Sequence, residues 1–442
     1  MRRRARALRL ALAACLLALA ALAGGCADGD AHRTVVVLGP WTGPEGAAFE
    51  DALARLSHHS GHHYVYKGTR SLRETLVAQL EAGAPPDVAI LNSIGELTEY
   101  AADGKLEPLS PQAAERGYPP WSPTLTLGGR HRTYWVPLRV NLKSVVWSKR
   151  AAGTEAPDWC VGMAAQATSG WPGTDWIEDI LLHQAGPDTY TRWATGRLDW
   201  KHDPAVRRAF TTWSEILGPR SPKSVERSLT MSFEGTPDPE HPNAPKRGLL
   251  GGSLPGCTHE HQGSFIRSLY PGAIADNTLR VEPAARFLHG QAAYKDTYEV
   301  SGDMAAVLTD NPAAQDLVTL LTSEDGRRTW SRSTDAHLRP FFPDATDPQP
   351  ADPTGRAVAS YLTHDADTLC FDASDVMPPV LRDAFYRAVL TYFQDPRTGT
   401  LDTLLGQLET VRTQIAGTPS GRSGQVRAPD DICASPGGQG LS

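Results

Sequence analysis

Residues 34–56, TVVVLGPWTGPEGAAFEDALARL, place a short apolar strand directly before an amphipathic helix. The run 34–38 is apolar throughout and ends at a Gly-Pro pair, as strands do when a parallel sheet is covered on both faces. A proline follows where the first helical turn tolerates one, and apolar residues then recur at helical spacing until Gly61. The stretch therefore predicts one β-α unit.

The residues that follow predict two more units of the same kind. Strands are expected at 63–67 and 87–91, and a helix follows each of them, one after Ser71 and one at 96–102. Ser71 and the glutamate three residues later form a capping-box pattern. A β-α-β-α-β-α chain folds as an open, mostly parallel sheet covered by helices, and its ligands bind beyond the carboxyl ends of the strands.

Two polar segments are expected at that edge of the sheet. Trp41 and Glu45 follow the first strand, and Asn92 follows the third. Because the carboxyl ends of parallel strands lie at the same edge, we predict these three residues on one wall of a binding site.

Residues 169–182, SGWPGTDWIEDILL, predict a second wall. Asp175 is expected to cap a helix whose apolar stripe faces a core, which leaves Trp171 and Trp176 at its mouth. A tryptophan face packs against the C–H face of a sugar ring, and a nearby carboxylate accepts hydrogen bonds from the sugar hydroxyls. The plainer alternative is a capped helix with both tryptophans in a core, and the stretch alone does not exclude it.

The first 25 residues predict an export signal, because five arginines precede the apolar run 10–23, which is short for a membrane span. The small residues before Cys26 resemble a bacterial lipoprotein signal, in which that cysteine is lipidated and becomes the mature N-terminus. Ala23 stands where a leucine is usual, which leaves cleavage without lipidation open. Extracytoplasmic localisation with a lipid anchor in the cell membrane is therefore expected.

Removal of residues 1–25 takes away five of the 43 Lys and Arg residues and none of the 50 Asp and Glu residues, which leaves a net charge of about −12. Such an acidic chain is not expected to bind nucleic acid. Four cysteines remain after Cys26, and an even number in an exported chain favours two disulfides over a zinc site. The sequence spacing leaves all three possible pairings open.

Motifs of common enzymes are absent from the sequence, which has no Walker loop, HExxH or GxSxG element. The pairs Asp175/Glu178 and Asp372/Asp375 could serve glycoside cleavage, but their spacing is more typical of the first turn of a capped helix. The histidines at 58–63 fit a solvated loop better than a metal site. His259 and His261 share one face of an expected strand and lack a third ligand, so no metal is predicted.

A series of motifs between residues 34 and 412 resembles the extracellular solute-binding proteins of carbohydrate ABC importers. The first lobe and the hinge of that family are similar to WTGPE (41–45), GAPPDVAI (83–90), GKLEPL (104–109) and VPLRVNLKSVVW (136–147). Residues 169–182 resemble its α-glucoside branch, and the likeness continues through CTHEHQGSFI (257–266), SGDM (301–304) and FDASDVMP (371–378). About one helix that relatives carry after Trp147 is missing here.

The resemblance implies a two-lobed α/β fold like that of periplasmic binding proteins, in which each lobe is an open, mostly parallel sheet covered by helices and a hinge near Arg139 and Ser301 joins them. The expected ranges are a signal peptide at 1–25, a tether at 26–33, a first lobe at 34–139 plus 301–340, a second lobe at 140–300 plus 341–416, and a Gly/Pro/Ser-rich tail at 417–442.

The family topology also brings distant residues together. It implies that Trp41, Trp171, Trp176 and Tyr386 meet in one cleft, and by likeness to the maltose-binding proteins it assigns ligand contacts to Glu45, Asn92 and Tyr386. It further implies disulfides Cys160–Cys257 and Cys370–Cys433, the second of which would hold the tail.

The implied function is that of a substrate-binding lipoprotein, which captures an α-glucoside or a related oligosaccharide between its lobes and delivers it to the permease of an ABC importer. Such a protein acts as a monomer, catalyses no reaction and needs no cofactor. The alternative is a membrane-anchored sugar sensor or scavenger with the same fold and no dedicated permease, which the missing helix after Trp147 keeps open.

Overall fold

The structure is a computed structural model, and it describes residues 34–152, 156–237, 239–241, 245–254, 256–288, 290–342, 347–417, 429 and 432–436. The expected signal peptide, the tether with Cys26 and most of the tail lie outside the described residues. None of the described helices is long and apolar enough to cross a membrane.

The first lobe is built from the three predicted β-α units. Strands β1 (Thr34–Gly39), β2 (His63–Gly68) and β3 (Val88–Leu91) lie parallel in the order β2-β1-β3, and each precedes a helix, α3 (Gly43–Ser60), α4 (Leu72–Glu81) or α5 (Ile94–Ala102). Gly61 ends α3 with a φ of 73°, a left-handed conformation that glycine adopts without strain. The predicted α/β class is confirmed.

The capping box expected at Ser71 is wrong. Ser71 is the N-cap of α4, but its hydroxyl accepts no hydrogen bond from the helix, and its backbone ψ of 51° departs from the extended geometry that capping requires. Its carbonyl oxygen instead accepts a 2.7 Å hydrogen bond from the hydroxyl of Thr75.

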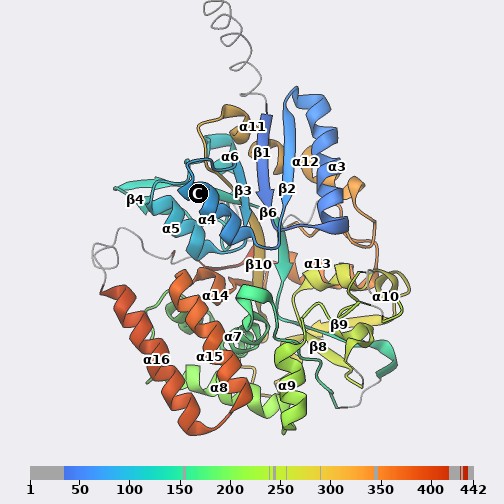
Figure 1. The fold of residues 1–442 in the computed structure, drawn as a ribbon, viewed down its shortest axis with the longest axis vertical. Helices are drawn as coiled ribbons and strands as arrows, with labels where there is room; N and C mark the ends of the chain where they lie inside the picture. Colours follow the sequence, from blue (N-terminus) through green and yellow to red (C-terminus); the bar gives the residue numbers. More distant parts are fainter. Residues whose placement is uncertain are drawn as a thin grey trace, which may run out of the picture.

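Two long antiparallel strands, β6 (Trp135–Leu142) and β10 (Thr297–Val307), cross from the first lobe to the second (Figure 1). Residues 304–307 of β10 pair with β3, whereas residues 297–300 pair with β11 (Thr368–Phe371). Every residue of β10 is buried. The crossing strands therefore join the strands of the first lobe to β11 in one sheet.

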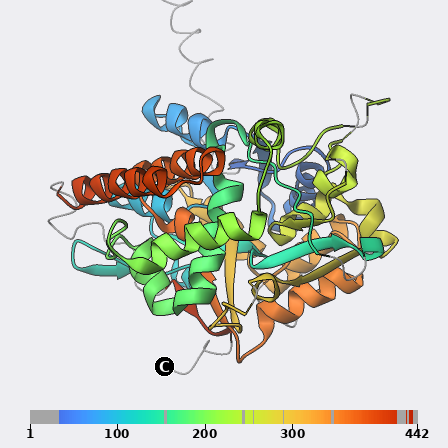
Figure 2. The same ribbon diagram turned by 90° about the horizontal axis from the view of Figure 1, so that it is seen from below.

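The second lobe combines a small sheet with a layer of helices. Strand β7 (Val145–Lys149) lies antiparallel between β8 (His259–His261) and β9 (Leu279–Pro283). Seen from below, α16 (red) and β7 (teal) lie on opposite sides of this lobe (Figure 2). Its principal helices are α7 (Trp171–Ala194), α8 (Pro204–Leu217), α9 (Pro222–Thr230), α14 (Ala373–Val376), α15 (Pro379–Gln394) and α16 (Thr398–Ala416).

The other elements are short or cover the two lobes. They are α6 (Pro111–Ala114), β4 (Leu125–Leu127), β5 (Arg130–Arg132), α10 (Pro271–Ala275), α11 (Pro312–Leu321), α12 (Glu324–Ser333), α13 (Pro353–Thr363) and β12 (Cys433–Ala434). Short 3-10 or π segments occur at Arg150–Ala152, Gln166–Thr168, Leu249–Ser253, Ser264–Leu269 and Ala284–Phe287.

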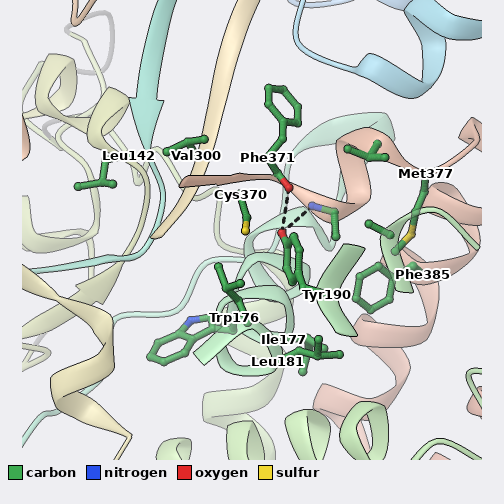
Figure 3. Packing of buried hydrophobic residues seen from close by; sticks show 14 of the residues in the cluster. Leu142, Trp176, Ile177, Leu181, Tyr190, Val300, Cys370, Phe371, Met377 and Phe385 are labelled. Carbon is green, nitrogen blue, oxygen red and sulfur yellow. Dashed lines mark hydrogen bonds between the residues drawn. The ribbon is translucent and has the colours of Figure 1, made fainter. Parts of the chain in front are cut away.

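A buried tyrosine fixes the end of β11 against α7. The Tyr190 hydroxyl accepts a 2.9 Å hydrogen bond from the Ala373 amide and donates one of 3.1 Å to the Phe371 carbonyl (Figure 3). Trp176 and Ile177 of α7 lie in the same hydrophobic cluster. Because buried polar groups must be paired, this contact defines the backbone turn that leads from β11 into α14.

Both disulfides implied by the resemblance are present. Cys160 pairs with Cys257, and Cys370 of β11 pairs with Cys433 of β12. Strand β12 also lies antiparallel to β11, with Cys370 opposite Cys433. Residues 433–434 of the tail therefore lie at the edge of the central sheet, which explains why a cysteine occurs in a segment of such polar composition.

Candidate ligand-binding site

A cleft with a volume of about 730 Å³ lies between the two lobes. The first lobe contributes the segments that follow β1, β2 and β3, and the second contributes the start of α7, residues 232–234 and the start of α15. The crossing strands supply Arg139, Asn141 and Asp303 between them. The cleft thus lies beyond the carboxyl ends of the first-lobe strands, where open α/β sheets bind ligands.

Helix α7 begins earlier than predicted. It starts at Trp171, with Gly170 as the N-cap and Pro172 in the first turn, so Asp175 lies inside the helix. The prediction that Asp175 caps the helix is wrong, because the proline favours the first helical turn and shifts the start upstream. Asp175 is 2% exposed, and its carboxylate points at a cation instead of at the helix end.

That cation is Lys143, which follows β6 and is almost fully buried. Its Nζ lies 2.7 Å from Asp175 Oδ2 and 2.9 Å from Asp372 Oδ2. Burial raises the pKa of Asp175 to about 6, against the effect of Lys143. Burial opposes ionisation of Asp372 too, but the Lys143 ammonium and a hydrogen bond with Glu178 outweigh it and lower the pKa of Asp372.

Three buried acids are close enough to one another to hold a cation. Oxygen atoms of Asp175, Glu299 and Asp372 all lie within 4.8 Å of one another, and the three side chains are buried. Lys143 already supplies positive charge to two of them. Burial and the neighbouring acids raise the pKa of Glu299 well above its usual range, which disfavours its ionised form.

Trp171 lies among aromatic side chains of the second lobe. Its ring meets Phe233 edge-on at 4.7 Å and Phe265 at 5.8 Å between centroids. The Lys143 ammonium lies 5.1 Å from the centre of the Trp171 ring, a cation–π distance. All four side chains line the cleft, where they form a surface that is apolar at the rings and charged beside them.

A similar arrangement occupies the first-lobe side of the cleft. The Arg139 guanidinium lies 4.7 Å from the centre of the Trp41 ring and bonds Glu45 Oε1 at 2.8 Å and Asp303 Oδ2 at 2.5 Å. Trp41 is only 2% exposed, because Phe49, Tyr66 and Trp330 surround its ring. On the first-lobe side of the cleft, the polar groups that face a ligand are therefore those of Glu45 and Arg139.

Asn92 and Tyr386 lie at the side of the cleft where α5 meets α14 and α15. Asn92 Nδ2 donates a 2.9 Å hydrogen bond to Asp375 Oδ2, and Ser93 Oγ donates one of 3.0 Å to the Asp375 carbonyl. Burial, together with the charge of Asp372, raises the pKa of Asp375 to about 8. Tyr386 lies 5.9 Å from the Arg382 guanidinium, which bonds Glu96.

The structure brings six of the seven predicted ligand contacts to the cleft lining: Trp41, Glu45, Asn92, Trp171, Asp175 and Tyr386. Trp176 is not among the lining residues. It is 4% exposed and stacks on His261 at 4.3 Å, inside the second-lobe core. Its neighbour Ile177 is also fully buried, because protein surrounds this part of α7 on all sides.

Sequence reasoning missed several prominent residues of the lining, above all Lys143, Phe233, Phe265 and Asp303. A usable signal existed for Lys143. It stands four residues after Arg139 in a run expected to be a buried crossing, and a buried lysine needs carboxylate partners. Phe233 lies in a loop and Phe265 in the short 3-10 segment Ser264–Leu269, and no local pattern marks either as a cleft residue.

The two-lobed α/β fold with a cleft between its lobes is shared with known proteins. The family described as "Bacterial extracellular solute-binding protein" matches residues 41–225. Over that range the chain is similar to these extracellular solute-binding proteins, and the relatives and solved structures below are named as binding proteins or receptors.

Two characterised relatives are similar along most of their length. The alpha-glucosides-binding periplasmic protein AglE of Rhizobium meliloti (strain 1021) is 27% identical over 78% of this chain and 80% of its own. The osmoprotective compounds-binding protein GgtB of Synechocystis sp. (strain ATCC 27184 / PCC 6803 / Kazusa) is 27% identical over 82% of this chain and 89% of its own.

Solved structures share the fold at low identity. The solute receptor AcbH, described as preferring β-D-galactopyranose, has a TM-score of 0.62 and 15% identity over 86% of this chain and 99% of its own. A chitin oligosaccharide binding protein has a TM-score of 0.61 and 14% identity over 86% and 98%. An ABC transporter solute-binding protein from Thermotoga lettingae, bound with α-D-tagatose, has a TM-score of 0.56 and 13% identity over 87% and 100%.

Proposed function

We propose that the protein is the substrate-binding lipoprotein of an ABC importer, and that it captures an α-glucoside or a related oligosaccharide between its lobes and delivers it to a permease. The observation that carries the proposal is the composition of the cleft, in which a partly exposed aromatic wall of Trp171 and Phe233 accompanies the polar groups of Glu45 and Asn92. Sugar rings need both kinds of surface.

The ligand contacts we propose are Trp41, Glu45, Asn92, Trp171, Asp175 and Tyr386. Trp171 would stack on a ring, and the oxygen atoms of Glu45 and Asn92 would accept hydrogen bonds from hydroxyls. The volume of about 730 Å³ leaves room for more than one sugar ring. The likeness to the α-glucoside-binding relative favours this class of ligand.

A thermal-shift screen tests the proposed ligand class. A ligand that binds only the folded state raises its stability, by about 2.7 kcal/mol at a concentration a hundred times Kd. We expect maltose or a longer α-glucoside to raise Tm. Trehalose and sucrose belong in the same screen, because the second relative binds osmoprotective compounds. If no carbohydrate raises Tm, the proposed function is wrong.

The membrane attachment is tested separately. We propose that Cys26 carries a lipid that keeps the mature protein on the outer side of the cell membrane. A Cys26→Ser variant should then leave the membrane fraction, while Cys370 and Cys433 keep their disulfide as an internal control for export. Retention of the variant in salt-washed membranes would show that another segment anchors the chain.

A further inference from the structure

Charged side chains cover much of the cleft, and acids outnumber bases among them. Nine Asp and Glu residues line the described cleft, against six Lys and Arg residues. The six cations are Arg70, Arg73, Arg139, Lys143, Lys246 and Arg382. The balance of formal charges is therefore negative on the surface that a ligand would meet.

The two cations of the segment that crosses between the lobes each have two carboxylate partners. Arg139 bonds Glu45 and Asp303, and Lys143 bonds Asp175 and Asp372. The side chain of Arg139 is 15% exposed and that of Lys143 is 6% exposed. In such a water-poor setting a cation exchanges its partners only at a large cost.

The remaining cations of the lining are paired as well. Arg382 and Arg73 share Glu96, and Arg73 also contacts Asp383 at 3.2 Å. At the mouth, Arg70 of the first lobe and Lys246 of the second both contact Glu234, at 3.3 and 2.5 Å. Within the described lining, every cation therefore already has a carboxylate partner.

We infer that the cleft accepts neutral sugars and rejects sugars that carry a carboxylate or a phosphate, because the cations of its described lining are already paired with carboxylates of the protein. The inference rests on the proposed sugar-binding function. An anionic group would have to displace a carboxylate from Arg139 or Lys143, or lie beside an acid of like charge. A neutral hydroxyl instead donates to the carboxylates, and can accept from the third ammonium proton of Lys143.

Two matched probe sets test the inference by titration calorimetry. The first set is methyl α-D-glucopyranoside, its C6 uronate and its C6 uronamide. The second set is maltose and the two maltose derivatives that carry a C6 uronate or a C6 uronamide on the non-reducing glucose. The uronate and the uronamide have nearly the same shape and differ in charge. We expect the uronamide to bind at least about ten times more tightly than the uronate, because like charges in an interface are strongly unfavourable.

A charge-removal variant provides a second arm. Asp303→Asn leaves Arg139 with one carboxylate partner, so it should reduce the preference for the uronamide by roughly tenfold. The ratio of the two affinities is insensitive to a general loss of folded protein. Asp316→Asn, at an exposed position of α11 outside the cleft, is the control and should leave the ratio unchanged.

The outcomes separate the inference from the proposed function. Equal affinity for uronate and uronamide in the wild type overturns the inference, while binding of maltose leaves the function in place. An unchanged ratio in Asp303→Asn contradicts the role of paired cations. Failure of all six probes to bind rejects the proposed α-glucoside function, and the inference with it.

Discussion

Arg139 and Lys143 lie four residues apart on the segment that crosses between the lobes, and each places its cation over a tryptophan of a different lobe. Arg139 lies 4.7 Å from the centre of the Trp41 ring, and Lys143 lies 5.1 Å from that of Trp171. Each also joins two carboxylates. A rotation of the lobes about this crossing would therefore move both cation–tryptophan pairs.

Replacement of Lys143 by methionine should strongly destabilise the second lobe. Asp175 and Asp372 would stay buried without their cation, and breaking one partner of a buried ion pair typically costs about 3–5 kcal/mol. The free energy of unfolding in urea measures the change. The exposed pair Arg55–Asp51 is the control, because the loss of a solvent-screened surface ion pair in Arg55→Met should cost far less. Equal losses in the two variants would contradict the buried role of Lys143.

Replacement of Trp171 by alanine should weaken binding of a confirmed sugar by roughly 1–3 kcal/mol, the worth of a buried aromatic contact. Titration calorimetry measures the affinity, and the melting temperature confirms that the fold remains. Tyr294, which is 44% exposed and does not line the cleft, is the matched control for removal of an aromatic ring. Unchanged affinity in Trp171→Ala would remove this residue from the site.

The sheet of the first lobe was predictable because its signals are local. The apolar runs at 34–38 and 87–91 and the helical stripes between them need no distant partner to be recognised, and all three β-α units are present. The place of Asn92 followed from topology alone, because the end of β3 must face the cleft of an open sheet. The disulfide pairing was available only through the family resemblance.

The second half of the cleft could not be derived in the same way. Whether Trp171 or Trp176 faces the cleft depends on where α7 begins, and Pro172 moves that start upstream of Asp175. Likewise, Lys143 and Asp372 are 229 residues apart in sequence and meet only through tertiary packing. Helix periodicity defines an apolar stripe, but it does not say which polar residues are buried with it.

The pKa of Asp375 predicts a pH-dependent contribution to stability. Burial and the charge of Asp372 raise this pKa from 3.8 to about 8, so between these values the folded state keeps a proton that the unfolded state has lost. Stability should therefore fall as pH rises through this window. The difference in free energy of unfolding between Asp375→Asn and wild type should therefore shift in favour of the variant by up to roughly 4 kcal/mol from pH 5 to pH 8. Each pKa unit corresponds to about 1.4 kcal/mol.

Urea unfolding at several pH values measures this difference. Asp395→Asn is the control, because a hydrogen bond from Arg397 lowers the pKa of Asp395 to about 2, so its protonation matters only below pH 4. A difference between wild type and Asp375→Asn that stays constant from pH 5 to pH 8 would show that Asp375 is ionised in the folded protein.

Gly170 directly precedes Trp171 and packs against the backbone of Tyr386, so its replacement by alanine should displace both aromatic residues. A Cβ atom at Gly170 would lie 2.4 Å from the Tyr386 carbonyl oxygen, and the φ of 110° is one that residues with side chains rarely adopt. The start of α7 at Trp171 would have to move away from α15. We expect Gly170→Ala to lower the free energy of unfolding by more than about 2 kcal/mol and to weaken sugar binding.

Gly61→Ala separates backbone strain from this steric clash. Gly61 also has a positive φ, 73°, but a Cβ atom there would meet no atom within 4 Å beyond its own chain neighbours, so only the conformational cost of about 1–2 kcal/mol should remain. Chemical denaturation and calorimetry of both variants distinguish the two costs. If the variants lose equal stability and both keep the wild-type sugar affinity, then close packing between Gly170 and Tyr386 does not hold the Trp171 side of the cleft in place.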